Sequence, residues 1–291
     1  MSVPDDQHHH EYVPLDATSL FWSLGYPRTN LLATGRALLM QVSHPTIAAG
    51  ILKHSKYLAD PWGRMRRSRE STLLRLFGGC LGVSEGVRLQ RMHSSIEGTD
   101  LVGNPYSALD LEPWQWTYSA SFDSILYYYR NYSRRLKVDD ESRLYSEWRY
   151  AGAQIGIRPS SMPTTLSQFE EYVQEMIVAR LDNNDASRSL LHAFTFGEVE
   201  RPWKFLPHSL WPVGRHIARQ VLKTGAIGSL PALLREKLNI DWTQQDERLL
   251  LRLKLAIRTI DHYTPSKLLH DQMAYAAVRA SRAPLRIRSL P

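Results

Sequence analysis

His93 is the residue whose type and setting point most directly to chemistry. On a helical wheel it lies between Leu89 and Ile96 and beside Gly86, opposite Arg91. We therefore expect the imidazole to point inward. A buried neutral imidazole can ligate iron through one nitrogen while the other donates a hydrogen bond, with Leu89 bordering the cofactor and Gly86 leaving room for a macrocycle. The alternative is a core histidine that is satisfied by a backbone carbonyl.

Three polar residues upstream form a second candidate group. Arg64, Arg67 and Ser68 are three and four positions apart, so they share one face of a predicted helix. A flat, doubly anionic cofactor such as haem needs cationic or hydrogen-bonding partners for its carboxylates when it is buried, and guanidinium groups supply paired donors. The same spacing also fits a solvated stripe or a phosphate site.

The remaining motifs narrow the class of site. His44 and His54 lie ten residues apart at the two ends of one predicted helix, so they do not form a zinc pair, although His44 could border a pocket. There is no glycine-rich phosphate loop, HExxH, GxSxG or paired CxxC motif, which disfavours nucleotide binding, zinc hydrolysis and serine esterase chemistry. Paired ExxH motifs of di-iron bundles are also missing, so haem fits better than a di-iron centre.

The elements that must position these residues are predicted to be helices. Apolar residues recur at intervals of three and four, and strand-like alternation is nearly absent, which predicts an all-α fold of roughly eleven helices. Caps and prolines place consecutive helices over Asn30–Val42, from Pro45 to about Ser55, from Pro61 to Gly78–Gly79, and from Ser84 to Gly98.

An aromatic helix is expected to begin at Pro113, and its dense Trp, Tyr and Phe content indicates a core role, with pocket lining as the alternative. The other predicted helices begin after Asp139, Thr165 and Asp185, near Ser209, and at Ser229, Thr243 and Pro265.

Composition sets the broader limits. The chain has 291 residues, is 43% hydrophobic, and carries 36 Lys and Arg against 29 Asp and Glu, for a net charge of +7. We expect one domain over residues 17–282, with a disordered tail at 1–16 and a basic tail at 283–291. The first residues lack signal-peptide features, no apolar run could cross a bilayer, and Cys80 is the single cysteine, which together predict a cytoplasmic protein.

The basic excess raises the question of an anionic partner. No recognised nucleic-acid motif is present, and the arginines are spread over several predicted helices, so we expect no nucleic-acid binding. Peripheral contact with a membrane surface stays open.

Three linked segments carry a family resemblance. The runs LLMQVSHPTIAAGILKHSKYLADPWGRMRRS, RMHSSIEGTDLVGNPYSALD and SLPALLREKLNIDWT resemble the catalytic-domain family of MpaB and the rubber oxygenases, or latex-clearing proteins. The similarity covers roughly residues 20–282. It implies a globin-like, all-helical core that binds one haem b, with His93 matching the proximal iron ligand.

The resemblance also assigns a distal side, where this sequence departs from the family. Arg64, Arg67 and Ser68 match positions that carry arginine, lysine and threonine in latex-clearing proteins. A lysine amine can ligate iron, whereas a guanidinium stays protonated and is a poor ligand, so Arg67 disfavours a lysine-ligated resting state. Trp116 is a second departure, because many relatives carry a histidine in that aromatic helix.

The function that the resemblance implies is dioxygen-dependent oxidation of a hydrophobic substrate, which in characterised members is cleavage of an isoprenoid carbon–carbon double bond. We therefore predict a haem b oxygenase acting on a small lipophilic substrate such as an isoprenoid or secondary metabolite. The alternatives are a haem-binding sensor or carrier without oxygenase activity, and a basic helical protein that binds nucleic acid or membrane.

Overall fold

The computed structural model describes residues 14–55, 60–133, 136–196 and 211–282. These residues form fourteen α-helices, three short 3-10 helices and one two-stranded antiparallel sheet of β1 (Glu97–Thr99) and β2 (Pro105–Ser107). The all-α prediction is confirmed. The helix count exceeds the predicted eleven partly because α1 (Leu20–Leu24) and α14 (Gln272–Arg282) were not expected as separate elements.

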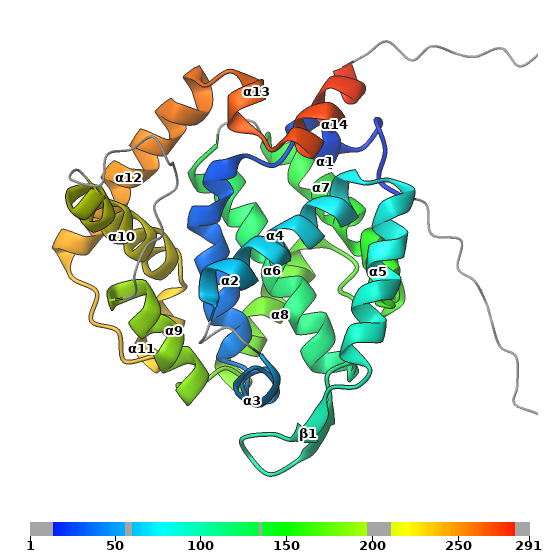
Figure 1. Cartoon of the computed structure of the whole chain (residues 1–291), viewed down its shortest axis with the longest axis vertical. Helices are drawn as coiled ribbons and strands as arrows, with labels where there is room; N and C mark the ends of the chain where they lie inside the picture. Colours follow the sequence, from blue (N-terminus) through cyan, green and yellow to red (C-terminus); the bar gives the residue numbers. More distant parts are fainter. Residues whose placement is uncertain (1–13, 56–59, 134–135, 197–210, 283–291) are drawn as a thin grey trace, which may run out of the picture.

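The long helix α6 (Leu111–Asn131) is the centre of the molecule (Figure 1). It packs along α2 (Leu31–Val42) and also contacts α7 (Val138–Ala151) and α8 (Leu166–Ala179). It begins two residues before the predicted start at Pro113. Most of its side chains are buried, so α6 is the element on which the other helices converge.

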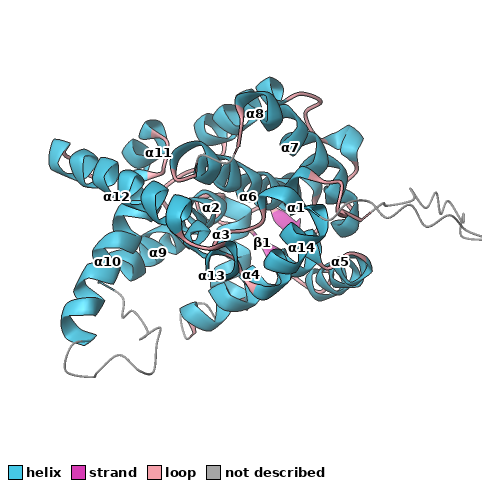
Figure 2. Cartoon of the chain, turned by 90° about the horizontal axis from the view of Figure 1, so that it is seen from above, coloured by secondary structure: helices cyan, strands magenta, loops and turns pink. Residues whose placement is uncertain are grey.

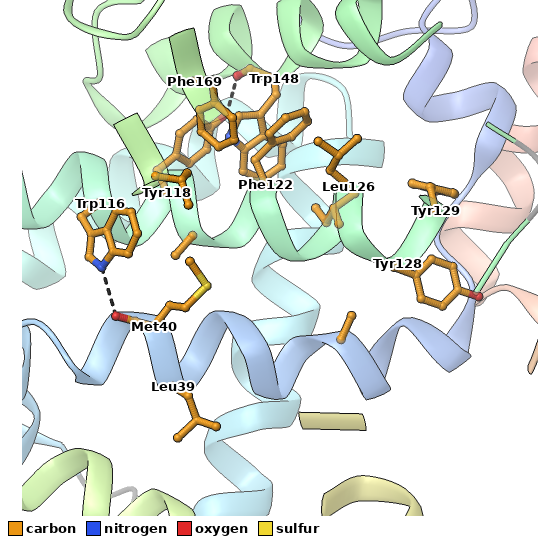
Figure 3. Packing of buried hydrophobic residues seen from close by; sticks show 14 of the residues in the cluster. Leu39, Met40, Trp116, Tyr118, Phe122, Leu126, Tyr128, Tyr129, Trp148 and Phe169 are labelled. Carbon is orange, nitrogen blue, oxygen red and sulfur yellow. Dashed lines mark hydrogen bonds between the residues drawn. The ribbon is translucent and has the colours of Figure 1, made fainter. Parts of the chain in front are cut away.

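Aromatic side chains from α6, α7 and α8 form the core (Figure 3). Tyr118 stacks on Trp148 with ring centroids 4.3 Å apart, and its hydroxyl donates to the Trp148 carbonyl at 2.7 Å. Phe122 contacts both Trp148 and Phe169. Removing one such ring costs about 3–5 kcal/mol, so this cluster fixes how α7 and α8 sit on α6. The predicted core role of the aromatic helix is confirmed.

The candidate residues lie on three consecutive helices, α3 (Pro45–His54), α4 (Pro61–Phe77) and α5 (Cys80–His93). The first two begin at the predicted prolines, and the Asp60 carboxylate caps α4 by accepting from the Gly63 N–H at 2.8 Å. The predicted bounds of α5 were wrong. Gly79 has a φ of 56°, which reverses the chain at once, so α5 begins four residues before Ser84.

The end of α5 also differs from the prediction of Gly98. The helix stops at His93 because the following residues pair in the β1–β2 hairpin, where Gly98 faces Tyr106. This hairpin turns the chain from α5 into α6 (Figure 1). His93 is therefore the last helical residue and not a mid-helix one.

Helices α9 (Asp185–Phe196), α10 (Trp211–Gly228), α11 (Ala232–Lys237) and α12 (Gln244–Tyr263) gather on the side of the molecule away from α5 (Figures 1 and 2). The short helix α13 (Ser266–Leu269) follows α12 and contacts α14. The 3-10 helices are η1 (Arg28–Asn30), η2 (Gly152–Ile155) and η3 (Pro159–Ser161). The predicted helix start near Ser209 lies outside the described residues.

The expected tails lie mostly outside the described residues, at 1–13 and 283–291. Leu15, which we had placed in the N-terminal tail, packs against the core. Among the helices that the structure describes, none combines the length and apolar character needed to cross a membrane.

Candidate active site around His93

The His93 imidazole is half-buried at the end of α5. Its Nδ1 lies 2.8 Å from the carbonyl oxygen of Leu89, one helical turn earlier. A carbonyl can only accept, so Nδ1 carries the proton and Nε2 holds the lone pair. Burial lowers the pKa of His93, outweighing the opposing effect of the Leu89 hydrogen bond, and nearby arginines lower it further. At neutral pH the ring is therefore a neutral imidazole with a basic Nε2.

Trp114 holds the His93 ring from the first turn of α6. The two ring centroids are 4.8 Å apart, with their planes inclined by 59°. The Trp114 indole donates in turn to the Ile155 carbonyl in η2 at 2.8 Å, which fixes the indole plane. Packing on one side and the Leu89 hydrogen bond on the other together restrict the imidazole to one orientation.

Arg64 is the member of the predicted arginine face that the structure brings to His93. Helices α4 and α5 run antiparallel, and Arg64 lies close enough to lower the pKa of the His93 imidazole through its positive charge. The side chain is half-buried. Its positive charge therefore acts on the neutral ring.

Arg67 and Ser68 lie on the same helix but are exposed. Arg67 turns back toward the start of α4 and donates to the Asp60 carboxylate at 3.1 Å, with 59% of its side chain exposed. The Gly63 N–H and Arg67 together lower the pKa of Asp60. The structure thus brings Arg64 to His93, but pairs Arg67 with the capping residue of its own helix.

An ion pair between Glu85 and Arg88, which was not predicted, lies within α5 upstream of His93. Arg88 donates to both oxygens of Glu85, at 2.7 Å each, although the Glu85 side chain is only 8% exposed. Arg88 is the main reason why the pKa of Glu85 is lowered, with a contribution from the Ser71 hydroxyl on α4. Arg88 also lowers the pKa of His93. The hydrogen bond between Glu85 and Ser71, and not the ion pair itself, links α5 to α4.

The side of Gly86 on which a Cβ atom would lie is occupied by the backbone of η2. A Cβ atom at this position would lie 2.0 Å from the carbonyl oxygen of Gln154. The glycine is required because the backbone of η2 approaches α5 at this point, and Gln90 donates to the same carbonyl at 3.3 Å. Gly86 therefore packs against η2, and that it also borders the cofactor stays a prediction, as it does for Leu89, which is partly buried against the core.

His44 lies on the other side of the first turn of α6. It is 1% exposed, and its Nε2 is 3.3 Å from Glu112, whose other oxygen accepts from Arg180 at 2.7 Å. Glu112 and Trp114 are two residues apart, which separates them by about 200° around a helix. His44 therefore belongs to a contact between α3, α6 and α8, and the structure does not bring it to His93.

Trp116 has a structural role. It is fully buried, donates to the Met40 carbonyl at 3.1 Å, and meets Tyr172 edge-on (Figure 3). The Trp116 indole fills the core between α2 and α6 at this position.

A separate, partly open cavity of about 260 Å³ lies near the third family segment, away from His93. Lys223, Asp241, Trp242 and Asp246 are among its lining residues. No histidine or cysteine lines it within the described part of the chain, so it offers no imidazole or thiolate ligand for iron. The candidate site is therefore His93 with Leu89, Trp114 and Arg64.

The fold and the site define an all-α protein with a neutral, oriented histidine beside a basic helix. Residues 22–260 match the family described as ER-bound oxygenase mpaB/B'/Rubber oxygenase, catalytic domain. The match covers most of the chain, which therefore belongs to this family of oxygenases. No curated protein and no solved structure matches the chain with significant similarity.

Proposed function

We propose that the protein is a haem b-dependent oxygenase that uses dioxygen to oxidise a small hydrophobic substrate, with His93 as the iron ligand. The observation that carries this proposal is the hydrogen bond from Nδ1 of His93 to Leu89, which leaves the Nε2 lone pair available. Membership in an oxygenase family supports the reaction class. For the substrate we propose an isoprenoid or secondary metabolite that is cleaved at a carbon–carbon double bond.

Haem b would supply the iron that activates dioxygen. The protein chain supplies the contacts that restrain His93, the residue that would ligate the iron. The Leu89 carbonyl makes Nδ1 the protonated nitrogen, Trp114 limits rotation of the ring, and partial burial keeps the imidazole neutral. Each of these favours a basic and fixed Nε2, which is what an iron ligand requires.

The basic face of α4 complements an anionic cofactor. Arg64 is placed to pair with a carboxylate near His93, because a guanidinium offers two parallel donors. We propose that Arg67 and Ser68 border the oxidising side of the site, as their matching positions do in latex-clearing proteins. Arg67 must first leave Asp60, and it would then donate hydrogen bonds and not ligate iron. That His44 and Gly86 also border the cofactor stays a prediction, and the proposal does not depend on it.

Absorbance of the freshly purified, untagged protein, followed by hemin titration, tests the proposal. The wild type should show a Soret band, and His93→Ala should weaken hemin binding by at least about 100-fold, since loss of a metal ligand or its support commonly costs 10–100-fold or more. His262→Ala, at an exposed position on α12, is the matched control and should bind like the wild type. Circular dichroism checks that both variants fold.

Three results would contradict the proposal. A full hemin spectrum in folded His93→Ala would remove His93 as the ligand. Colourless wild type that takes up no hemin would reject the haem site altogether. Hemin-loaded protein that consumes no dioxygen with any lipophilic alkene would favour the haem sensor or carrier.

A further inference from the structure

The outer surface of α12 and α13 carries an unusual combination of side chains. From Arg248 to Leu268, large apolar side chains stand in solvent, among them Leu251 at 51%, Leu255 at 60% and Tyr263 at 77% exposed. Leu249, Ile260 and Leu268 are exposed on the same segment. We call the exposed side chains of this segment the α12 face. Single exposed leucines are ordinary, but Leu251 and Leu255 lie one turn apart on the same side of α12, and several other exposed apolar side chains on the same segment mark an interaction surface.

The charges on the α12 face have one sign. Arg248, Arg252 and Lys267 are exposed between the apolar residues. The only carboxylate from Arg248 to Leu268 is Asp261, which is 2% exposed. It faces inward and accepts hydrogen bonds from Tyr128 at 3.2 Å and Ser133 at 3.0 Å. Every exposed charge within the α12 face is therefore positive, and the exposed carboxylate nearest to it in sequence is Glu247, one residue before Arg248.

The shape of the surface limits the kind of partner. Helix α12 has 20 residues and is about 30 Å long. It lies at the outer edge of the molecule in both views, on the side away from α5 (Figures 1 and 2). A convex, nearly straight helix that presents leucines, a tyrosine and arginines together suits a flat surface with an apolar interior and an anionic boundary.

We propose that the α12 face docks the protein on a lipid surface bearing anionic headgroups. The leucines and Tyr263 enter the boundary between headgroups and acyl chains, while Arg248 and Arg252 pair with phosphate and carboxylate groups. A second copy of this chain is a poorer occupant, because a two-fold contact would bring together the same excess of positive charge from both copies. The proposal is independent of the haem site.

Flotation of the full-length protein with lipid vesicles tests the docking. The probes are vesicles of phosphatidylcholine alone and of phosphatidylcholine with phosphatidylserine. The wild type should float with the anionic vesicles and remain behind with the neutral ones. The double variant Leu251→Gln/Leu255→Gln should bind about tenfold more weakly, because two partly buried leucines are lost. Arg248→Gln/Arg252→Gln should lose the preference for phosphatidylserine at low salt.

Val178→Gln is the matched control, since Val178 is 59% exposed on α8, outside the α12 face. It should float like the wild type. Equal flotation of the wild type and the leucine variant, or no flotation of the wild type, would overturn the proposal. Light scattering without lipid adds one more check: a dimer that the leucine variant abolishes would assign the surface to a second copy of the chain.

Discussion

His93 and His44 lie on opposite sides of the first turn of α6, and burial lowers the pKa of both. They differ in which nitrogen is engaged. His93 donates from Nδ1 to a carbonyl of its own helix. Its lone pair is therefore on Nε2, the ring nitrogen farther from the main chain. His44 donates from Nε2 to Glu112 and keeps its lone pair on Nδ1, beside its own backbone.

The surroundings of the two imidazole rings also differ. The His44 ring is fully enclosed, and its Nδ1 has no hydrogen-bond partner among the described residues. A macrocycle could not approach that nitrogen past the main chain of α3. Burial alone therefore does not distinguish a ligand from a structural histidine. The direction of the one hydrogen bond does, because it decides whether the free lone pair faces outward or is shielded.

The largest loss of stability should come from a substitution that disturbs the packing of α5, the helix that carries His93, and leaves the surroundings of His44 unchanged. Gly86→Ala places a methyl group 2.0 Å from the Gln154 carbonyl, so α5 must shift away from η2. We expect a loss of about 1–3 kcal/mol in the free energy of unfolding, together with weaker hemin binding. Urea denaturation measures the first quantity.

Gly50→Ala in α3, near His44, is the matched control. Its Cβ would lie 3.5 Å from the nearest atom, the Tyr106 hydroxyl, which is an ordinary contact. This variant should be neutral or stabilised by up to about 1 kcal/mol, because alanine favours the helix. Equal stability of the two variants would contradict the close approach of η2 to Gly86.

The second prediction concerns how much each histidine contributes to the pH dependence of stability. The pKa of His44 in the folded protein lies below the unfolded value of 6.5, so the folded state favours the neutral ring. Its contribution to stability is complete above pH 6.5 and declines as the pH falls toward the lowered folded pKa, by at most about 1.4 kcal/mol per pH unit. His44→Gln, which keeps a donor for Glu112, should flatten the acid side of the stability profile.

The same substitution at His93 should flatten the profile less, because its ring is only half-buried. Urea denaturation over a series of pH values makes this comparison. A profile that His44→Gln leaves unchanged would show that the buried ring does not stay neutral.

The smallest effect concerns the arginines. Arg64 lowers the pKa of His93, so Arg64→Gln should raise it, whereas Arg67→Gln should leave it unchanged because Arg67 pairs with Asp60. Titration of the His93 ring protons by NMR, in protein without hemin, measures the shift. A larger shift in Arg67→Gln would reverse our assignment of the two arginines.

Local signals in the sequence predict most of the fold. The starts of α4 and α12 follow from capping by Asp60 and Thr243, which act within one turn. Helix α1 was missed because part of its support is distant. Its first N–H groups, at Leu20 and Phe21, donate to Glu147 of α7 at 2.7 and 3.1 Å, a contact that no local pattern reveals.

The residues of the candidate site also differ in whether local sequence patterns reveal them. Helical spacing selects His93 and Arg64, because both lie on faces that a wheel displays. Spacing cannot find Trp114, since its contact with His93 depends on the β1–β2 hairpin turning the chain into α6. It also cannot reveal why position 86 is a glycine, because the atom that lies against it belongs to Gln154, far away in sequence.

Resonance Raman spectroscopy of the reduced, hemin-loaded protein tests most directly whether Nε2 of His93 is the iron ligand. The account predicts an iron–histidine stretching band in the wild type and in His44→Gln, its loss in His93→Gly, and the return of an iron–imidazole band when imidazole is added to that variant. A band that persists in His93→Gly without imidazole, or that disappears in His44→Gln, would contradict it.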